Sequence, residues 1–560
     1  MHKYLKTALF SVLPLVTALL CAHFALPTST PLALPAPPPS RQHLLLAPLD
    51  SRPVCSTMVQ KLGQLAGLNV ILPPKAFLDN YQTPAKREKL LQWLAYCTPY
   101  YEHSIISADL LLHGGLLAAR RSSATEPQED ALLTSLGKLH AGQKNGGSQA
   151  IFSIIPRLLV SDQLLPDRWY QYQLWRYSQL ADMVRISGSF YLTQKLRETE
   201  AKIPPKVLNK YQQLYKQSDR FNKGLLQLAH KTPDLQLVIG QDDASPIGLP
   251  HASASRIASR IEGQRLSNAQ LTYGADELAT LLLVRYYLAK QAWQPKVYFM
   301  YAAPQTEQKT MPYTPAAVST VLRSQLALIG AAEAAAPEDA DLVCYINCGD
   351  DDLLPGTQQI EAVRALLSTG RPVALVDSSA NFAPAELLLP KLLYSSVPVN
   401  RLAAYAGWNT FSNSSGTALA QGLIFAGRLR ELRRYGGSEA QYASLYADNL
   451  SFTAERILED YYYQKLLHPS LRHDLEVQGI DPTDLTAAAK QQTTEEIQSR
   501  MALDAFLLLH ENLGQTPFYE HNGSRYYLRN LFVSAQLPWT RIFEVELTIW
   551  PHIGVSKAKE

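Results

Sequence analysis

The sequence predicts an α/β fold, and two observations lead to that prediction. The 560-residue chain contains eight short apolar runs, each ending in polar or Gly/Pro residues before a segment with helical periodicity. These runs are nearly continuous instead of alternating, which is typical of strands buried on both faces of a parallel sheet. Eight is also the number of strands in a closed (β/α)8 barrel. We therefore expect a TIM-barrel-like fold, with a doubly wound parallel sheet as the alternative.

The expected strands can be located from these runs. They are HLLLAPLD (43–50), IISADLLLHGG (105–115), AIFSIIPR (150–157), LQLVIGQDD (235–243), KVYFMYAAP (296–304), LVCYINCGDDD (342–352), PVALVDSSANF (372–382) and LAAYAGWNT (402–410). A ninth run, NVILPP at 69–74, does not fit an eight-strand count. It keeps the doubly wound alternative open.

Four segments are expected along the chain. Residues 1–25 combine a basic start with an apolar run, which is typical of a signal peptide or a signal anchor, and residues 26–41 form a proline-rich linker. An α/β barrel-like catalytic domain is expected over 42–430, with a helical insertion over 163–234. Residues 431–560 are rich in helical pattern and end near the alternating EVELTIW, so we expect a C-terminal α+β module there.

The composition limits the classes of partner. The chain is 46% hydrophobic and 18% charged, as in ordinary soluble proteins, and its net charge of +3 is too small to predict nucleic-acid binding. After the N-terminal segment no apolar run is long enough to span a bilayer. We expect an exported protein, periplasmic or extracellular, that contacts the membrane only through its N-terminal segment.

Polar residues at the expected strand ends form the candidate site, because those ends converge on one face of a barrel. They are Asp50, Arg52, His113, Arg157, Gln241, Asp242, Asp243, Asn347, Asp350, Asp377, Trp408, Asn409 and Asn413. Carboxylates can protonate a leaving oxygen, amides and arginines bond sugar hydroxyls, and an indole stacks on a sugar ring. This inventory predicts binding of a carbohydrate or another small polar substrate and favours glycosidic chemistry without a cofactor.

The adjacent aspartates of QDD carry the most specific part of this prediction. One of Asp242 and Asp243, by preference Asp243, would be a general acid whose pKa is raised by its neighbour's charge. The other would orient the acetamido group of an N-acetylated sugar, an arrangement similar to that in substrate-assisted hexosaminidases. The alternative without function is a helix cap or an Asx turn before Pro246.

Other interpretations stay open at this point. Asp50 and Arg52 either bind substrate or pair with each other, whereas Asp276 and Glu277 are interpreted as first-turn helix residues. A metal-dependent hydrolase of phosphate or sulfate esters would use Asp242, Asp243, Asp350, Asp351 and His113, with a divalent cation. A non-catalytic envelope protein would bind a glycan through the same residues.

Several motifs also occur together in a fixed order. These are APLDSRPV, HGGL, IPR, QDDASPIG, YGADE and GWNTFSNSSGTALA. The set resembles a bacterial domain-of-unknown-function family, number 4127, from about residue 43 to the C-terminus. The resemblance implies that these stretches belong together, and it assigns no activity to any of them.

Overall fold

The computed structural model describes residues 43–121, 124–143, 147–159, 168–349 and 356–557. The chain divides into two units, 1–39 and 40–560, and every described residue belongs to the second. The expected signal segment and linker therefore lie outside the described residues, as do Asp350 and Asp351. Within the described residues, no helix is both long and apolar enough to cross a membrane.

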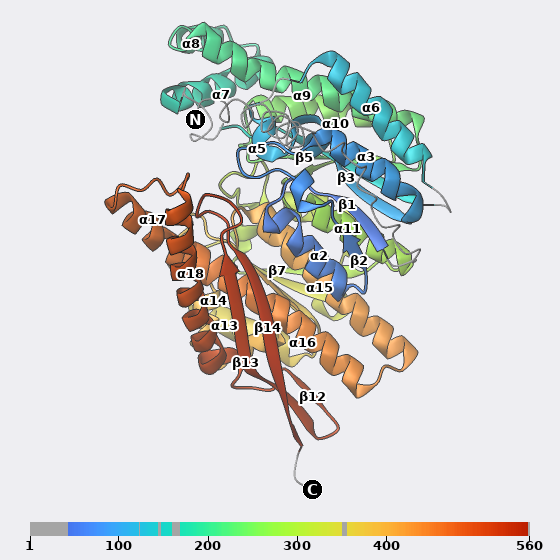
Figure 1. Cartoon of the computed structure of the whole chain (residues 1–560), viewed down its shortest axis with the longest axis vertical. Helices are drawn as coiled ribbons and strands as arrows, with labels where there is room; N and C mark the ends of the chain where they lie inside the picture. Colours follow the sequence, from blue (N-terminus) through green and yellow to red (C-terminus); the bar gives the residue numbers. More distant parts are fainter. Residues whose placement is uncertain (1–42, 122–123, 144–146, 160–167, 350–355, 558–560) are drawn as a thin grey trace, which may run out of the picture. The chain divides into compact units, whose positions relative to one another are not determined.

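Parallel strands form two separate sheets (Figure 1). The first has the order β2 (Asn69–Ile71), β1 (His43–Ala47), β3 (His103–Ser107), β4 (Ser148–Ile155), β5 (Leu235–Gln241), β6 (Ala269–Tyr273). The second has the order β11 (Ala404–Ala406), β10 (Val373–Asp377), β9 (Leu342–Asn347), β7 (Lys296–Tyr301), β8 (Ala332–Glu333). When the strands of each sheet are renumbered in chain order, the first sheet has the order 2-1-3-4-5-6. The second, taken from β8 to β11, has the order 2-1-3-4-5. Both orders are typical of a doubly wound sheet.

The α/β class is confirmed, but the closed barrel is wrong. Both sheets are open, with β2 and β6 at the edges of one and β8 and β11 at the edges of the other, and the described residues form no barrel. Four of the eight apolar runs supply strands to each sheet, and NVILPP supplies the edge strand β2. Continuous apolar runs report burial on both faces, which open and closed parallel sheets share.

Helices cover both faces of each sheet. Between the sheets lie α2 (Thr57–Leu65), α11 (Leu278–Lys290) and α15 (Phe411–Tyr435) (Figure 1), together with α12 (Val318–Ile329). They share one apolar core with Leu44 and Leu46 of β1 and with Leu342 and Ile346 of β9. Because successive strand side chains point to opposite faces, the intervening Val343 of β9 packs into a second core on the far face of its sheet.

The remaining helices pack outside this pair of sheets. Against the first sheet and its neighbours lie α3 (Arg87–Cys97), α4 (Ala108–His113), α5 (Leu116–Ala119), α6 (Glu126–Ala141), α7 (Gln171–Ser187), α8 (Phe190–Glu200), α9 (Pro205–Lys231) and α10 (Leu249–Gly263). With the second sheet are α13 (Gly356–Ser368), α14 (Leu389–Leu393), α16 (Glu439–Arg456), the π-helix η10 (Ile457–Leu467), α17 (His468–Val477) and α18 (Ala487–Leu508). An antiparallel sheet of β12 (Tyr519–His521), β13 (Ser524–Gln536) and β14 (Glu546–Lys557) packs on α16 and α18.

One expected strand is shorter than its apolar run. In IISADLLLHGG the strand ends at Ser107, whose hydroxyl accepts a hydrogen bond from the Leu110 backbone and caps α4. His113 is therefore the last residue of a helix and does not lie at a strand end. Gly114 ends this helix in the left-handed conformation, with φ of 91°.

Candidate functional site

A cleft of about 660 Å³ opens at the carboxyl ends of both parallel sheets. The first sheet contributes Arg52 after β1, Arg157 after β4, Asp242 and Asp243 after β5, and Asp276 after β6. The second contributes Tyr313 after β7, Phe382 after β10, and Trp408, Asn409 and Asn413 after β11. Open parallel sheets bind ligands outside the carboxyl ends of their strands, so this cleft is the candidate functional site.

The backbone of Gln241, Asp242 and Asp243 is fixed by the strands on both sides. The Asp242 amide donates to the Ile155 carbonyl at 3.2 Å, and the Leu158 amide donates to the Asp243 carbonyl at 2.8 Å. On the other side, the Gly274 amide donates to the Gln241 carbonyl at 2.9 Å. The QDD segment is therefore positioned by hydrogen bonds to the strand ends of β4 and β6.

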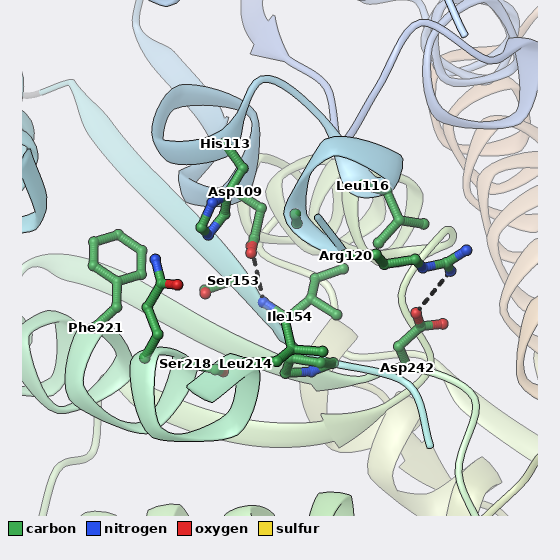
Figure 2. Close-up of a pocket in the computed structure, with 13 residues that line it drawn as sticks. Asp109, His113, Leu116, Arg120, Ser153, Ile154, Leu214, Ser218, Phe221 and Asp242 are labelled. Carbon is green, nitrogen blue, oxygen red and sulfur yellow. Dashed lines mark hydrogen bonds and ion pairs between the residues drawn. The ribbon is translucent and has the colours of Figure 1, made fainter. Parts of the chain in front are cut away.

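Asp242 is held as a carboxylate. Its Oδ2 lies 3.1 Å from Nη2 of Arg120 (Figure 2). Its Oδ1 accepts a hydrogen bond of 2.8 Å from the Asp243 amide. Burial by itself would raise the pKa of Asp242, but the charges of Arg120 and Arg157 outweigh burial and lower it. Both carboxylate oxygens are thus engaged by the protein, and the residue is only 6% exposed.

Asp243 differs from its neighbour in exposure and in charge state. Its Oδ2 lies 3.0 Å from Nη2 of Arg157, and 21% of its side chain is accessible from the cleft. Burial and the charge of Asp242 raise the pKa of Asp243 to about 6, against the opposing effect of Arg157. The two adjacent carboxyl groups are therefore poised oppositely, with Asp242 ionised and Asp243 able to hold a proton near pH 6.

A buried ion triad borders the cleft next to this pair. Nη2 of Arg52 lies 2.7 Å from Asp50 and 2.6 Å from Asp276. Asp50 is completely buried, whereas Arg52 and Asp276 line the cleft. Burial raises the pKa of Asp276, although Arg52 opposes this effect. Asp50 does not line the cleft, but it holds Arg52 in place and its charge raises the pKa of Asp276.

The interpretation of Asp276 and Glu277 as first-turn helix residues needs correction. Helix α11 begins at Leu278, after both of them, and Glu277 is its N-cap residue without a side-chain capping bond. The carboxylate of Glu277 is fully buried and accepts a 2.7 Å hydrogen bond from Asn413. Burial, followed by the charge of Asp276, raises the pKa of Glu277 to about 8. Its Oε1 has no hydrogen-bond partner among the described residues.

The loop after β11 forms the opposite wall with few accessible atoms. Asn409 donates a 2.8 Å hydrogen bond to Asn413, and it occupies the left-handed region with φ of 49°. The indole Nε1 of Trp408 donates to the Thr417 hydroxyl at 3.1 Å, and Trp408 is 6% exposed. Little of its ring is therefore accessible for the stacking expected from the sequence.

Two other aromatic residues present their rings more openly. Tyr313 and Phe382 are 46% and 39% exposed, and their ring centroids are 5.9 Å apart. Both have positive φ, 60° and 59°, which is rare for residues with bulky side chains. Both residues line the cleft, and strained backbone of this kind is frequent at functional sites, so we include this aromatic pair in the candidate site.

Several predicted residues lie outside the cleft. Asn347 donates a 2.7 Å hydrogen bond to Asp377, which in turn accepts from the backbone amides that start α14, so this pair has a structural role. Gln241 is the buried last residue of β5 and does not line the cleft. His113 borders a separate cavity of about 30 Å³ behind the Arg120–Asp242 pair, beside Asp109 (Figure 2).

The described residues do not bring together the ligands that the metal-dependent alternative requires. They contain no group of three or more His, Cys, Asp and Glu side chains placed to hold a metal ion. Asp242 and Asp243 contact arginines, His113 lies outside the cleft, and Asp350 and Asp351 are outside the described residues.

Comparison with known proteins identifies the family. The family model described as "Protein of unknown function (DUF4127)" matches residues 44–548. The chain belongs to the DUF4127 family. No curated protein and no solved structure matches this chain.

Sequence reasoning missed several residues of the DUF4127 cleft. Arg120 follows α5 in HGGLLAARR, and its contact with Asp242 spans 122 residues. Tyr313, Phe382 and Lys465 lie in loops and in η10, without a motif that marks them. The available signal was chemical, because two adjacent carboxylates near a buried strand end require cationic partners from elsewhere in the chain.

Proposed function

We propose that this DUF4127 protein is an exported glycoside hydrolase with Asp243 as its general acid. The observation that carries the proposal is that two adjacent carboxyl groups in one cleft have pKa values shifted in opposite directions. Asp242 is fixed as a carboxylate by Arg120, and Asp243 faces the cleft with its pKa raised to about 6. A carboxyl group with this pKa can donate a proton to a glycosidic oxygen near neutral pH.

The reaction balances with groups that the cleft contains and with water. Asp243 transfers its proton to the glycosidic oxygen as the bond from this oxygen to the anomeric carbon breaks. Water then adds its hydroxyl group to the anomeric carbon, and its proton returns to the Asp243 carboxylate. Arg157, 3.0 Å from Asp243, orients the carboxyl group and stabilises it while it is ionised.

Asp242 acts through Asp243 in this proposal. Because both of its oxygens already accept hydrogen bonds from the protein, we assign it the role of a positioning residue that raises the proton affinity of Asp243. The acetamido contact expected from the sequence would require one of these bonds to be replaced. A preference for N-acetylated sugars therefore stays a prediction, and the substrate panel below includes such sugars.

The test compares Asp243→Asn with Asp219→Asn on a panel of glycosides. Asp219 is a suitable control because its side chain is also 21% exposed and pairs with an arginine, Arg256, away from the cleft. We expect Asp243→Asn to lower kcat/KM by about 100-fold or more on substrates with poor leaving groups. The loss should be smaller for nitrophenyl glycosides, whose leaving groups need little protonation.

Two outcomes would contradict the proposal. One is a wild-type protein that binds glycosides but hydrolyses none across neutral, acidic and N-acetylated members of the panel. The other is an Asp243→Asn variant that keeps wild-type activity on poor leaving groups.

A further inference from the structure

Nearly all cationic side chains of the cleft are neutralised by a carboxylate of the protein. Arg120 and Arg157 pair with the two adjacent aspartates, and Arg52 lies between Asp50 and Asp276. Arg541 and Arg472 likewise pair with glutamates of their own segments. Lys465 is the exception, because no carboxylate of the described residues lies within ion-pair distance of its Nζ.

Lys465 projects from the π-helix η10 and is half-buried at the cleft. Its Nζ lies 5.3 Å from the ring centroid of Phe382, which packs against Tyr313. The Tyr313 carbonyl accepts a 3.0 Å hydrogen bond from the amide of Ala244, the residue after Asp243. A continuous wall therefore runs from the ammonium group, across two exposed aromatic rings, to the proposed acid.

The protein compensates the charge of this ammonium group only in part, through the ring of Phe382 and carboxylates beyond ion-pair distance. Burial lowers the pKa of Lys465, and the carboxylates of Asp460, Asp377 and Glu386 offset this effect only from a distance. One of these carboxylates, Asp460, is itself paired with Arg456. A ligand anion at Lys465 would form a charge-assisted hydrogen bond in a partly desolvated place, where such bonds are strong.

We propose that the cleft selects a sugar that carries an anionic group, with this group bound by Lys465 and the sugar ring placed against Tyr313 and Phe382. The inference rests on the proposed function for the sugar and adds the charge of the substrate. The anionic group is a carboxylate, as in a uronic acid, or a sulfate or phosphate ester, since all of them accept hydrogen bonds from an ammonium group.

Arg157 supports this inference from the other end of the wall. When Asp243 carries the proton that it is proposed to donate, the Arg157 guanidinium loses its only carboxylate partner within ion-pair distance among the described residues. Arg157 then interacts only with the more distant charges of Asp242 and Asp276. The positive charge that this leaves in the cleft favours an acidic ligand over a neutral one.

Binding to the Asp243→Asn protein tests the proposal, because this variant mimics the neutral acid and should not consume its ligand. Titration calorimetry would compare three oligosaccharides of equal length: a neutral one, an oligouronate and a sulfated derivative of the neutral one. At low salt we expect one acidic oligosaccharide to bind about tenfold or more tightly than the neutral one, with the difference shrinking as salt is added. The uronate and sulfate arms identify which anion is preferred.

The role of Lys465 is tested by Lys465→Met in the same background. Lys490→Met is the matched control, because Lys490 is also half-buried with a pKa lowered by burial, and it lies outside the cleft. The preference for the acidic sugar should become much smaller in Lys465→Met and stay unchanged in Lys490→Met. Lys465→Arg should restore it, which separates loss of charge from a folding defect.

Three results would overturn the inference: equal affinity for acidic and neutral sugars, no binding of any acidic sugar, or a preference that is as large in Lys465→Met as with Lys465 in place. The outcome is separable from the proposed function. Acidic sugars that bind without being hydrolysed by the wild-type protein would retain the inference and refute the hydrolase. Hydrolysis of neutral glycosides, together with equal affinity for acidic and neutral sugars, would retain the hydrolase and refute the inference.

Discussion

At the scale of single residues, surroundings decide the charge of each carboxyl group in the cleft. Asp242 and Asp243 are adjacent in sequence, yet Arg120 and a backbone amide stabilise the charge of the first, whereas burial and that same charge disfavour ionisation of the second. Glu277 is fully buried, and the hydrogen bond that it accepts from Asn413 does not offset the effect of burial on its pKa. Proximity along the chain therefore says little about protonation.

The buried Glu277 predicts a pH-dependent stability. Its folded-state pKa of about 8 exceeds its ordinary value of 4.5, so between these pH values the folded chain holds a proton that the unfolded chain has lost. The free energy of unfolding should therefore fall as pH rises through this window, by up to about 1.4 kcal/mol per pH unit for one proton. Glu277→Gln cannot ionise, so its free energy of unfolding should decrease less with pH than that of the wild-type protein. At pH 8 the variant should be more stable than the wild-type protein.

Urea unfolding at pH 5, 6, 7 and 8 measures this slope. Glu495→Gln on the surface of α18 serves as the control and should keep the wild-type slope. An unchanged slope in Glu277→Gln would show that this carboxyl group is ionised in the folded protein.

At the scale of elements, short turns after the strands place the cleft residues. The turn between β6 and α11 shows this most clearly, because Gly274 has φ of 97° and its amide donates to Gln241 of the neighbouring strand. A Cβ atom at this position would overlap the carboxylate of Glu277. The turn thus requires glycine both for its backbone conformation and for the close approach of Glu277.

Gly274→Ala should consequently be destabilising. We expect a loss of about 1 kcal/mol or more from the positive φ, with a further loss from the displaced Glu277 side chain. Gly263→Ala is the control, since a Cβ there would meet no atom within 4 Å and Gly263 is the last residue of α10. Chemical denaturation should show a lower midpoint for Gly274→Ala alone, and equal midpoints for the two variants would contradict this account of the turn.

The limits of prediction from sequence are also clearest at this scale. Apolar runs predicted the strands that are buried on both faces, including β5 with its polar end, because burial determines side-chain polarity along the chain. The edge strand β6, AQLTY, is half-buried and was missed for the same reason. IISADLLLHGG was extended too far, because a serine cap inside an apolar run starts a helix without changing the hydrophobicity.

At the scale of the whole described unit, two open sheets of one winding order place residues from their carboxyl ends around one cleft. Convergence of the strand ends could be predicted without knowing whether the sheet closes, so Asp242, Asp243, Arg157 and Trp408 were assigned to one site, and all of them line the cleft. The partner arginine Arg120 could not be predicted, because its pairing depends on tertiary packing between segments that are distant in sequence.

The pH dependence of kcat/KM on a glycoside with a poor leaving group tests the role of Asp243 most directly. For the wild-type protein we predict that kcat/KM falls as pH rises above about 6, because Asp243 then loses the proton that it donates. Asp243→Asn should be slow at every pH and should lack this limb. A wild-type profile that is flat from pH 5 to 8, or the same limb in Asp243→Asn, would contradict the assignment of Asp243 as the general acid.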